Sequence, residues 1–109
     1  HTHHGTTNGV FMPYVLVFNR PAIEAKIARL AGFLGIEGGF DGFRKAVIKL
    51  RKDLKVPHTL SGLVKGFDPD KKRKDLIASM AIVDPTAGGN PVKLTKKGAL
   101  QILEAAMAG

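Results

Sequence analysis

The sequence predicts an all-α protein, a bundle of about five helices that forms a single domain over residues 1–109. Two observations lead to this fold class. Apolar residues recur at spacings of three and four along the chain, and glycines and prolines fall between the apolar stretches. The length agrees with it, because 109 residues can surround one hydrophobic core but are short for a two-domain enzyme.

The first apolar run predicts a helix over residues 5–18, kinked at Pro13 and capped by Thr6, Thr7 or Asn8. After it, Asn19-Arg20-Pro21 predicts a stop and the start of a second helix with proline in its first turn. Gly35 is expected to end this second helix. Its predicted core stripe consists of Ile23, Ile27, Leu30, Ala31 and Leu34.

A third helix is predicted over residues 40–54, before Val56-Pro57. Its predicted core stripe consists of Phe40, Phe43, Val47, Leu50 and Leu54. Its basic residues are expected to form the solvated face: Arg44, Lys45, Lys49, Arg51, Lys52 and Lys55.

Residues 57–67 lack a clear period and are predicted to form a loop with at most a short helical turn. A fourth helix is expected to start at Asp68-Pro69 and to stop at Pro85. Its predicted apolar face consists of Leu76, Ile77, Met80, Ala81 and Val83. Thr95 can cap a last helix that carries Leu100, Leu103 and Met107.

Composition bounds the class of protein. The chain has no cysteine, which excludes disulfides and thiolate metal sites and is compatible with the cytoplasmic location that we expect. Its longest apolar run, residues 9–18, is about half of the roughly 20 residues that a membrane helix needs, so no membrane partner is expected. No signal peptide is visible, and the missing initial methionine suggests a fragment or a processed product.

The net charge of +8 and the pI of about 10.1 raise nucleic acid as a partner. The basic residues lie on the expected solvated faces without interleaved aromatics, and neither a zinc-finger spacing nor an RNA-binding motif is present. We therefore expect no nucleic-acid partner. A basic helical nucleic-acid-binding module and a self-standing helical interaction domain stay open as alternatives.

Three histidines precede the first apolar run, which is where metal chemistry is suspected: His1, His3 and His4. A purification tag is the competing interpretation. Adjacent residues on a helix diverge by about 100°, so only one of His3 and His4 is expected to bind a given ion. If His1 is the true terminus, its amine and His3 can form a chelate for copper or nickel.

Two groups of residues carry a family resemblance. The first is His4-Gly5, Asn8-Gly9, Met12-Pro13-Tyr14-Val15 and Phe18-Asn19, and the second is the loop Asp84-Pro85-Thr86-Ala87-Gly88-Gly89-Asn90-Pro91. In this order and separation they resemble landmarks in the C-terminal helical half of iron-containing alcohol dehydrogenases. The resemblance implies the C-terminal domain of the fold that these enzymes share with dehydroquinate synthase.

The resemblance also implies a site. His4 corresponds to the last metal ligand of the family, whose other ligands, an Asp and two His, would lie upstream of residue 1. Thr86 corresponds to a residue of the substrate pocket, at a position where many members carry a cysteine near the nicotinamide. Val92 corresponds to a position where several members carry arginine. Asn8 is more simply a cap than a substrate contact, His58 is expected to be a solvent-facing loop residue, and Tyr14 a core residue.

The resemblance implies hydride transfer between a small alcohol or aldehyde and NAD(P), with Fe(II) or Zn polarising the substrate oxygen. An upstream dinucleotide-binding domain of the same chain would hold the nicotinamide, and the intact protein is expected to be a homo-oligomer. The isolated chain should bind neither cofactor tightly and should be inactive, because one protein ligand does not retain such a metal. A zinc-dependent glycerol dehydrogenase is the alternative within the same superfamily.

Overall fold

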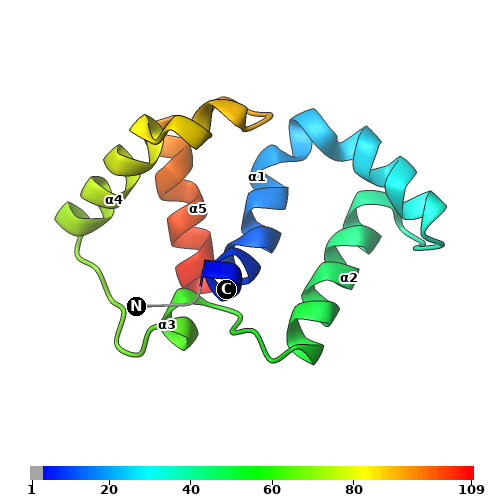
Figure 1. The fold of residues 1–109 in the computed structure, drawn as a ribbon, viewed down its shortest axis with the longest axis horizontal. Helices are drawn as coiled ribbons and strands as arrows, with labels where there is room; N and C mark the ends of the chain where they lie inside the picture. Colours follow the sequence, from blue (N-terminus) through cyan, green and yellow to red (C-terminus); the bar gives the residue numbers. More distant parts are fainter. Residues whose placement is uncertain (1–3) are drawn as a thin grey trace.

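The computed structural model describes residues 4–109, with side chains from residue 5 onward. Its elements are α1 (His4–Phe33), α2 (Gly39–Asp53), α3 (Leu60–Leu63), α4 (Lys71–Val83), the 3₁₀ helix η1 (Pro85–Gly89) and α5 (Lys96–Ala108) (Figure 1). All regular elements between residues 4 and 109 are helical, which confirms the predicted all-α class. Over the same residues no helix is long and apolar enough to cross a membrane.

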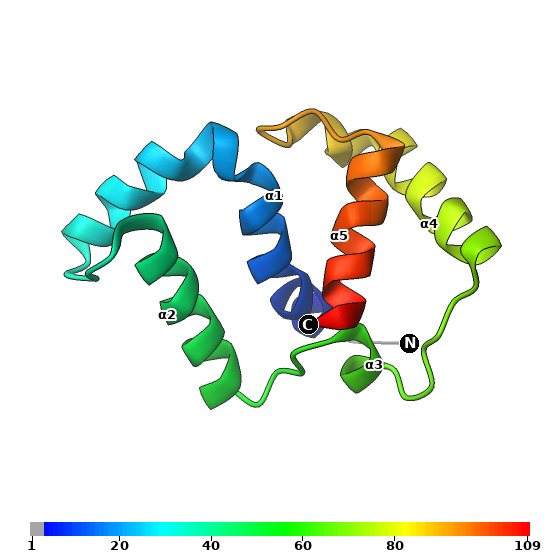
Figure 2. The same cartoon turned by 180° about the vertical axis from the view of Figure 1, so that it is seen from behind.

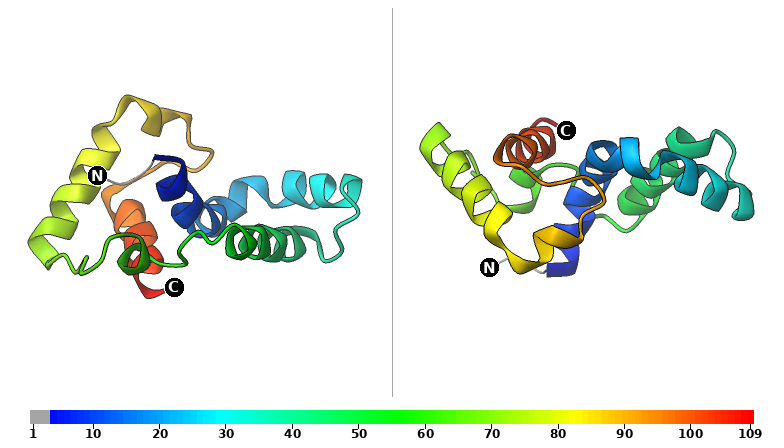
Figure 3. Two further views of the ribbon diagram at one scale, coloured as in Figure 1. Left: turned by 60° about the horizontal axis from the view of Figure 1, so that its bottom comes forward. Right: turned by 90° about the horizontal axis from the view of Figure 1, so that it is seen from above.

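Two helical layers meet at the centre of the molecule. The first half of α1 lies beside α5, and the second half of α1 turns away to pair with α2 (Figures 1 and 2). On the other side α4 packs against α5, and the short α3 closes the end where α1 begins and α5 finishes. Figure 3 shows that α2 and the second half of α1 project from the rest of the bundle.

The first two predicted helices are one. The prediction of a stop at Asn19 is wrong, because α1 runs through both Pro13 and Pro21 without a break. A proline removes one backbone hydrogen bond and bends a helix but need not end it. Figure 1 shows α1 changing direction near residue 20, close to Pro21. The predicted end is confirmed, since Gly35 has a φ of 72° and follows the last residues of α1.

The N-terminal caps predicted for this helix are wrong. Because α1 begins at His4, Thr6, Thr7 and Asn8 lie within it and none is its N-cap residue. His1 and His3, with their predicted terminal chelate, lie outside the described residues.

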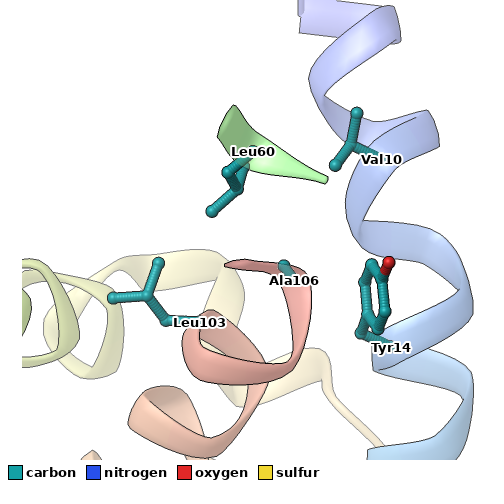
Figure 4. Packing of buried hydrophobic residues seen from close by; sticks show 5 residues of the cluster. All are labelled: Val10, Tyr14, Leu60, Leu103 and Ala106. Carbon is teal, nitrogen blue, oxygen red and sulfur yellow. The ribbon is translucent and has the colours of Figure 1, made fainter. Parts of the chain in front are cut away.

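The hydrophobic core lies where α1, α3 and α5 meet. Its buried members are Val10, Tyr14, Leu60, Leu103 and Ala106, and Figure 4 shows them converging from these three helices. The expectation that Tyr14 is a core residue is confirmed. α5 comes so close to α1 at Gly98 that a β-carbon there would lie 2.7 Å from the Phe18 ring. Glycine at this position therefore permits the central helix contact.

Several apolar residues predicted to be core are exposed instead: Leu30, Leu34, Leu50, Leu54, Leu76, Met80 and Val83. They are exposed because their helices have few neighbouring helices to pack against. α2 contacts only α1, and α4 contacts only α5 and η1. A helix that packs against one side buries a narrow stripe, which in α4 contains the small residue Ala78. The remaining apolar face of each helix is left open to solvent.

The predicted boundaries of the later elements largely hold. Thr59 caps the short α3, which confirms a loop with one helical turn, and Thr95 caps α5 as predicted. Pro85 ends α4 and opens η1. The start of α4 differs from the prediction, because Asp70 and not Asp68 supplies the cap.

The end of α2 contains a backbone conformation that is unusual for its residue type. Lys55 has a φ of 60°, in the left-handed region. The backbone N–H of Val56 donates to the carbonyl of Arg51 at 3.0 Å across this turn, as in the glycine-terminated ends of many helices. A lysine in this conformation costs free energy that a glycine avoids.

We therefore expect Lys55→Gly to raise the free energy of unfolding by about 1 kcal/mol. The matched control is Lys52→Gly, which places glycine inside the last turn of α2 and should lower that free energy by about 0.5–1 kcal/mol. Urea unfolding followed by circular dichroism measures both changes. Equal destabilisation by the two variants would contradict the left-handed assignment.

Candidate functional site

The loop that contains the Gly-Asn-Pro motif is anchored to the bend in α1. Asn19 and Asn90 exchange two side-chain amide hydrogen bonds, with N···O distances of 2.9 and 2.7 Å. The Asn90 amide also donates to the carbonyl of Val92 at 2.5 Å. Asn19 is 6% exposed, so this pair replaces water that the buried amide would otherwise need. The pair joins residues 71 positions apart in the sequence.

Local chemistry shapes the other end of the same loop. Asp84 precedes η1 and accepts from the backbone N–H of Thr86 at 2.8 Å and from its hydroxyl at 2.6 Å. The Thr86 hydroxyl and then its N–H lower the pKa of the Asp84 carboxyl, because both stabilise the charged form. Thr86 itself is exposed, and its hydroxyl proton is engaged by Asp84.

The two residues that the resemblance assigns to the site lie on different elements. His4 is the first residue of α1, and its side chain lies outside the described residues. Thr86 belongs to η1, beside the bend of α1 to which Asn90 ties the loop (Figures 1 and 2). At about 1.5 Å per residue, His4 and Asn19 are about 22 Å apart along the helix. In Figure 1 the start of α1 and η1 lie at opposite ends of the first arm of α1.

The described part of the chain does not by itself form a metal centre. From residue 5 onward, no three side chains of His, Asp or Glu are close enough together to hold a metal ion. Iron and zinc sites normally use at least three protein ligands. A metal at His4 would thus need ligands that these residues do not supply.

A pocket of about 560 Å³ lies between α1 and α5. Its lining is mostly apolar and includes Tyr14, Val17, Phe18 and Ile102, with Arg44 and Gln101 as polar members. The Arg44 Nε–H donates to the carbonyl of Pro13 at 3.4 Å, so this side chain reaches from α2 to α1. The pocket offers an apolar surface next to one cationic group.

The arrangement around Arg51 was missed by the sequence reasoning, which placed this residue on the solvated face of its helix. That placement is wrong, because Arg51 is 5% exposed and its guanidinium donates to the carbonyl of Val10 at 3.0 Å. A signal existed in the spacing. Phe40, Arg44, Val47 and Arg51 follow one another at four, three and four residues, so both arginines share the face of α2 that packs against α1.

His58 was expected to be a solvent-facing loop residue, and its side chain is indeed exposed. It nevertheless takes part in the same cluster. The hydroxyl of Tyr14 donates to the carbonyl of His58 at 2.6 Å, and the guanidinium of Arg51 bonds the ring Nδ1 of His58. The loop after α2 is thereby attached to the core through one tyrosine and one arginine.

Comparison with known proteins gives two matches. A model of the Fe-containing alcohol dehydrogenase family, C-terminal part, matches residues 1–107. An NADPH-dependent butanol dehydrogenase of Clostridium saccharobutylicum is 30% identical over 114 residues, an alignment that includes 100% of this chain and 29% of that dehydrogenase. The chain thus spans less than a third of this relative's length. No solved structure matches the chain.

The amide pair can be tested by a double-mutant cycle. Asn90→Ala should lower the free energy of unfolding by about 1–3 kcal/mol, because it leaves the buried Asn19 amide unpaired. In the Asn90→Ala variant, the further change Asn19→Ala should lower the free energy of unfolding less than Asn19→Ala does alone, with a coupling energy of at least about 0.5 kcal/mol. The control cycle combines Asn19→Ala with Gln101→Ala and should be additive. Urea unfolding gives all four values, and additivity of Asn19 with Asn90 would contradict the pairing.

The Thr86 hydroxyl can be tested through the pKa of Asp84. Thr86→Val keeps the shape of the side chain and the N–H donor but removes the hydroxyl, so the pKa should rise toward the ordinary value for aspartate. Because the pKa of Asp84 is lowered in the folded chain, the hydrogen bonds from Thr86 stabilise the turn at pH values above the ordinary pKa of aspartate. This stabilisation is lost as the pH falls through the lowered pKa of Asp84. Carboxyl-carbon NMR titration of Asp84 measures the shift, with Thr95→Val as a control that should leave it unchanged.

Proposed function

The chain belongs to the family of Fe-containing alcohol dehydrogenases, whose C-terminal part it matches over residues 1–107, and from this membership we propose its function. It forms the helical part of a metal-dependent alcohol dehydrogenase that transfers hydride between a small alcohol or aldehyde and a nicotinamide. The family match over almost the whole chain is the observation that carries this proposal.

In this proposal His4 donates one imidazole to the metal. Its position supports the role, since a residue in the first turn of a long helix is held by the packed turns that follow it. One imidazole does not hold iron or zinc against water, and the described residues supply no cluster to complete the site. The other ligands are therefore assigned to the part of the protein upstream of this chain, and the chain alone is expected to be inactive.

Thr86 is proposed to line the substrate pocket. The Asn19–Asn90 pair supports this role, because it gives the loop a defined position against α1. His4 opens α1 and Thr86 lies in η1, so in this proposal the metal ligand and the pocket residue come from different elements.

The nicotinamide is assigned to an upstream dinucleotide-binding domain. The similarity to a butanol dehydrogenase described as NADPH-dependent makes NADPH and butanol the first pair to assay. A homo-oligomer is proposed for the intact protein, with the exposed apolar faces of α2 and α4 as surfaces that further contacts can cover.

The fold does not favour the alternative of a nucleic-acid-binding module. Several basic side chains of the chain make contacts within the fold: Arg20 pairs with Asp41 at 3.1 Å, Lys74 pairs with Glu104 at 2.9 Å, and Arg51 is buried. Part of the positive charge thus stabilises helix contacts.

The decisive variant is His4→Ala in the longer protein that contains this chain. Loss of one ligand should reduce bound metal and alcohol oxidation together, each by roughly 100-fold or more in affinity or rate. Metal analysis and an NADPH-coupled assay measure the two quantities. His3→Ala is the matched control, because the proposal assigns the ligand role to His4 alone, and this variant should leave both quantities unchanged. Full metal content and activity in His4→Ala would contradict the assignment.

A further inference from the structure

A second concave surface lies at the C-terminal end of α2, away from the proposed substrate pocket. It has a volume of about 360 Å³ and is lined by Ile48, Arg51, Lys52, Lys55, Val56 and His58. Three of these six residues carry a positive charge and none carries a negative one. The surface is therefore strongly cationic.

Arg51 gives this pocket an uncompensated charge. Its side chain is 5% exposed, and within residues 5–109 its guanidinium bonds neutral acceptors, the carbonyl of Val10 and the ring of His58. The central carbon of the Arg51 guanidinium lies 5.8 Å from the centroid of the Tyr14 ring. Among residues 5–109 no carboxylate lies within ion-pair distance of it. A buried charge without a counter-charge is costly, so an anion at this position would be stabilised.

Hydrogen-bonding capacity is also left over. A guanidinium has five N–H donors, and two hydrogen bonds from Arg51 are made within the protein. A planar donor group with free N–H positions matches the oxygens of carboxylate and phosphate. The nearest acidic residue in the sequence, Asp53, pairs with Lys49 at 3.5 Å and does not line the pocket.

The two lysines complete the surface. Lys52 and Lys55 are both exposed, and Lys55 holds the left-handed conformation described above. Basic residues at a helix C-terminus often do no more than offset the helix dipole. That explanation accounts for Lys52 and Lys55, but it does not account for an arginine that is buried beside a pocket and has no anionic partner among residues 5–109.

We propose that the pocket formed by Arg51, Lys52, Lys55 and His58 is an oxyanion-binding site. The ligand is a phosphate or carboxylate group that neutralises the guanidinium of Arg51. It is supplied either by a free small anion or by an acidic side chain from the rest of the longer protein. The residues that line the pocket do not include His4 or Thr86, and its existence does not depend on the proposed dehydrogenase activity.

Inorganic phosphate is the probe, titrated into the isotopically labelled 109-residue chain at pH 7 and constant ionic strength. The NMR signals of the Arg51 guanidinium and the His58 ring should shift together and reach saturation. Lys52→Gln with Lys55→Gly should weaken phosphate binding roughly five- to tenfold, since it removes two exposed cations. This double variant keeps Arg51 in its buried position, and Lys55→Gly is expected to stabilise the fold.

The matched control is Lys45→Gln with Lys49→Gln, which removes the same charge from α2 outside the pocket and should change the affinity less than twofold. Shifts that never saturate, or equal weakening by the two double variants, would overturn the proposal, because both outcomes describe diffuse charge attraction. The longer protein distinguishes the sources. Phosphate binding that persists there identifies a free anion, whereas binding lost there but retained by the 109-residue chain identifies an internal carboxylate.

Discussion

The structure depends on one long helix that bends without ending. α1 contacts α2, α3 and α5, so the direction of each of its two halves decides where those helices can lie. The first half forms the core with α3 and α5, and the second half forms the pair with α2. Because a bend at a proline changes direction while most backbone hydrogen bonds persist, both arms stay rigid and can support a site.

The bend also explains why the Gly-Asn-Pro loop has a defined place. The buried amide of Asn19 requires partners, and Asn90 satisfies it with a reciprocal pair. η1, with its cap at Asp84, compacts the residues before that anchor. This glycine-containing loop is thus tied to α1 by a contact between residues 71 positions apart in the sequence. The attachment supports the proposed role of Thr86, because it gives the loop that carries this residue a defined position against α1.

Arg44 and Arg51 of α2 show that helix packing, and not charge alone, decides whether a side chain faces solvent or a neighbouring helix. Arg44 and Arg51 reach across to carbonyl groups of α1 at Pro13 and Val10. These contacts join two helices that share few large buried side chains, while Leu50 and Leu54 stay exposed on the other face. The cationic pocket at the end of α2 is a consequence, because one of these arginines is buried where no carboxylate of residues 5–109 accompanies it.

The sequence by itself determined the all-α class, the ends of α2, the termination of α1 at Gly35 and of α4 at Pro85, and the cap of α5. These features depend on residues close together in the chain, through periodicity, glycine conformation and capping. It also indicated the family and the candidate residues His4 and Thr86. Only the tertiary structure decided that α1 is continuous, that Arg51 is buried while Leu50 and Leu76 are exposed, and that Asn19 pairs with Asn90. Those outcomes depend on which helix faces meet, and local spacing does not specify contacts between segments that are distant in the chain.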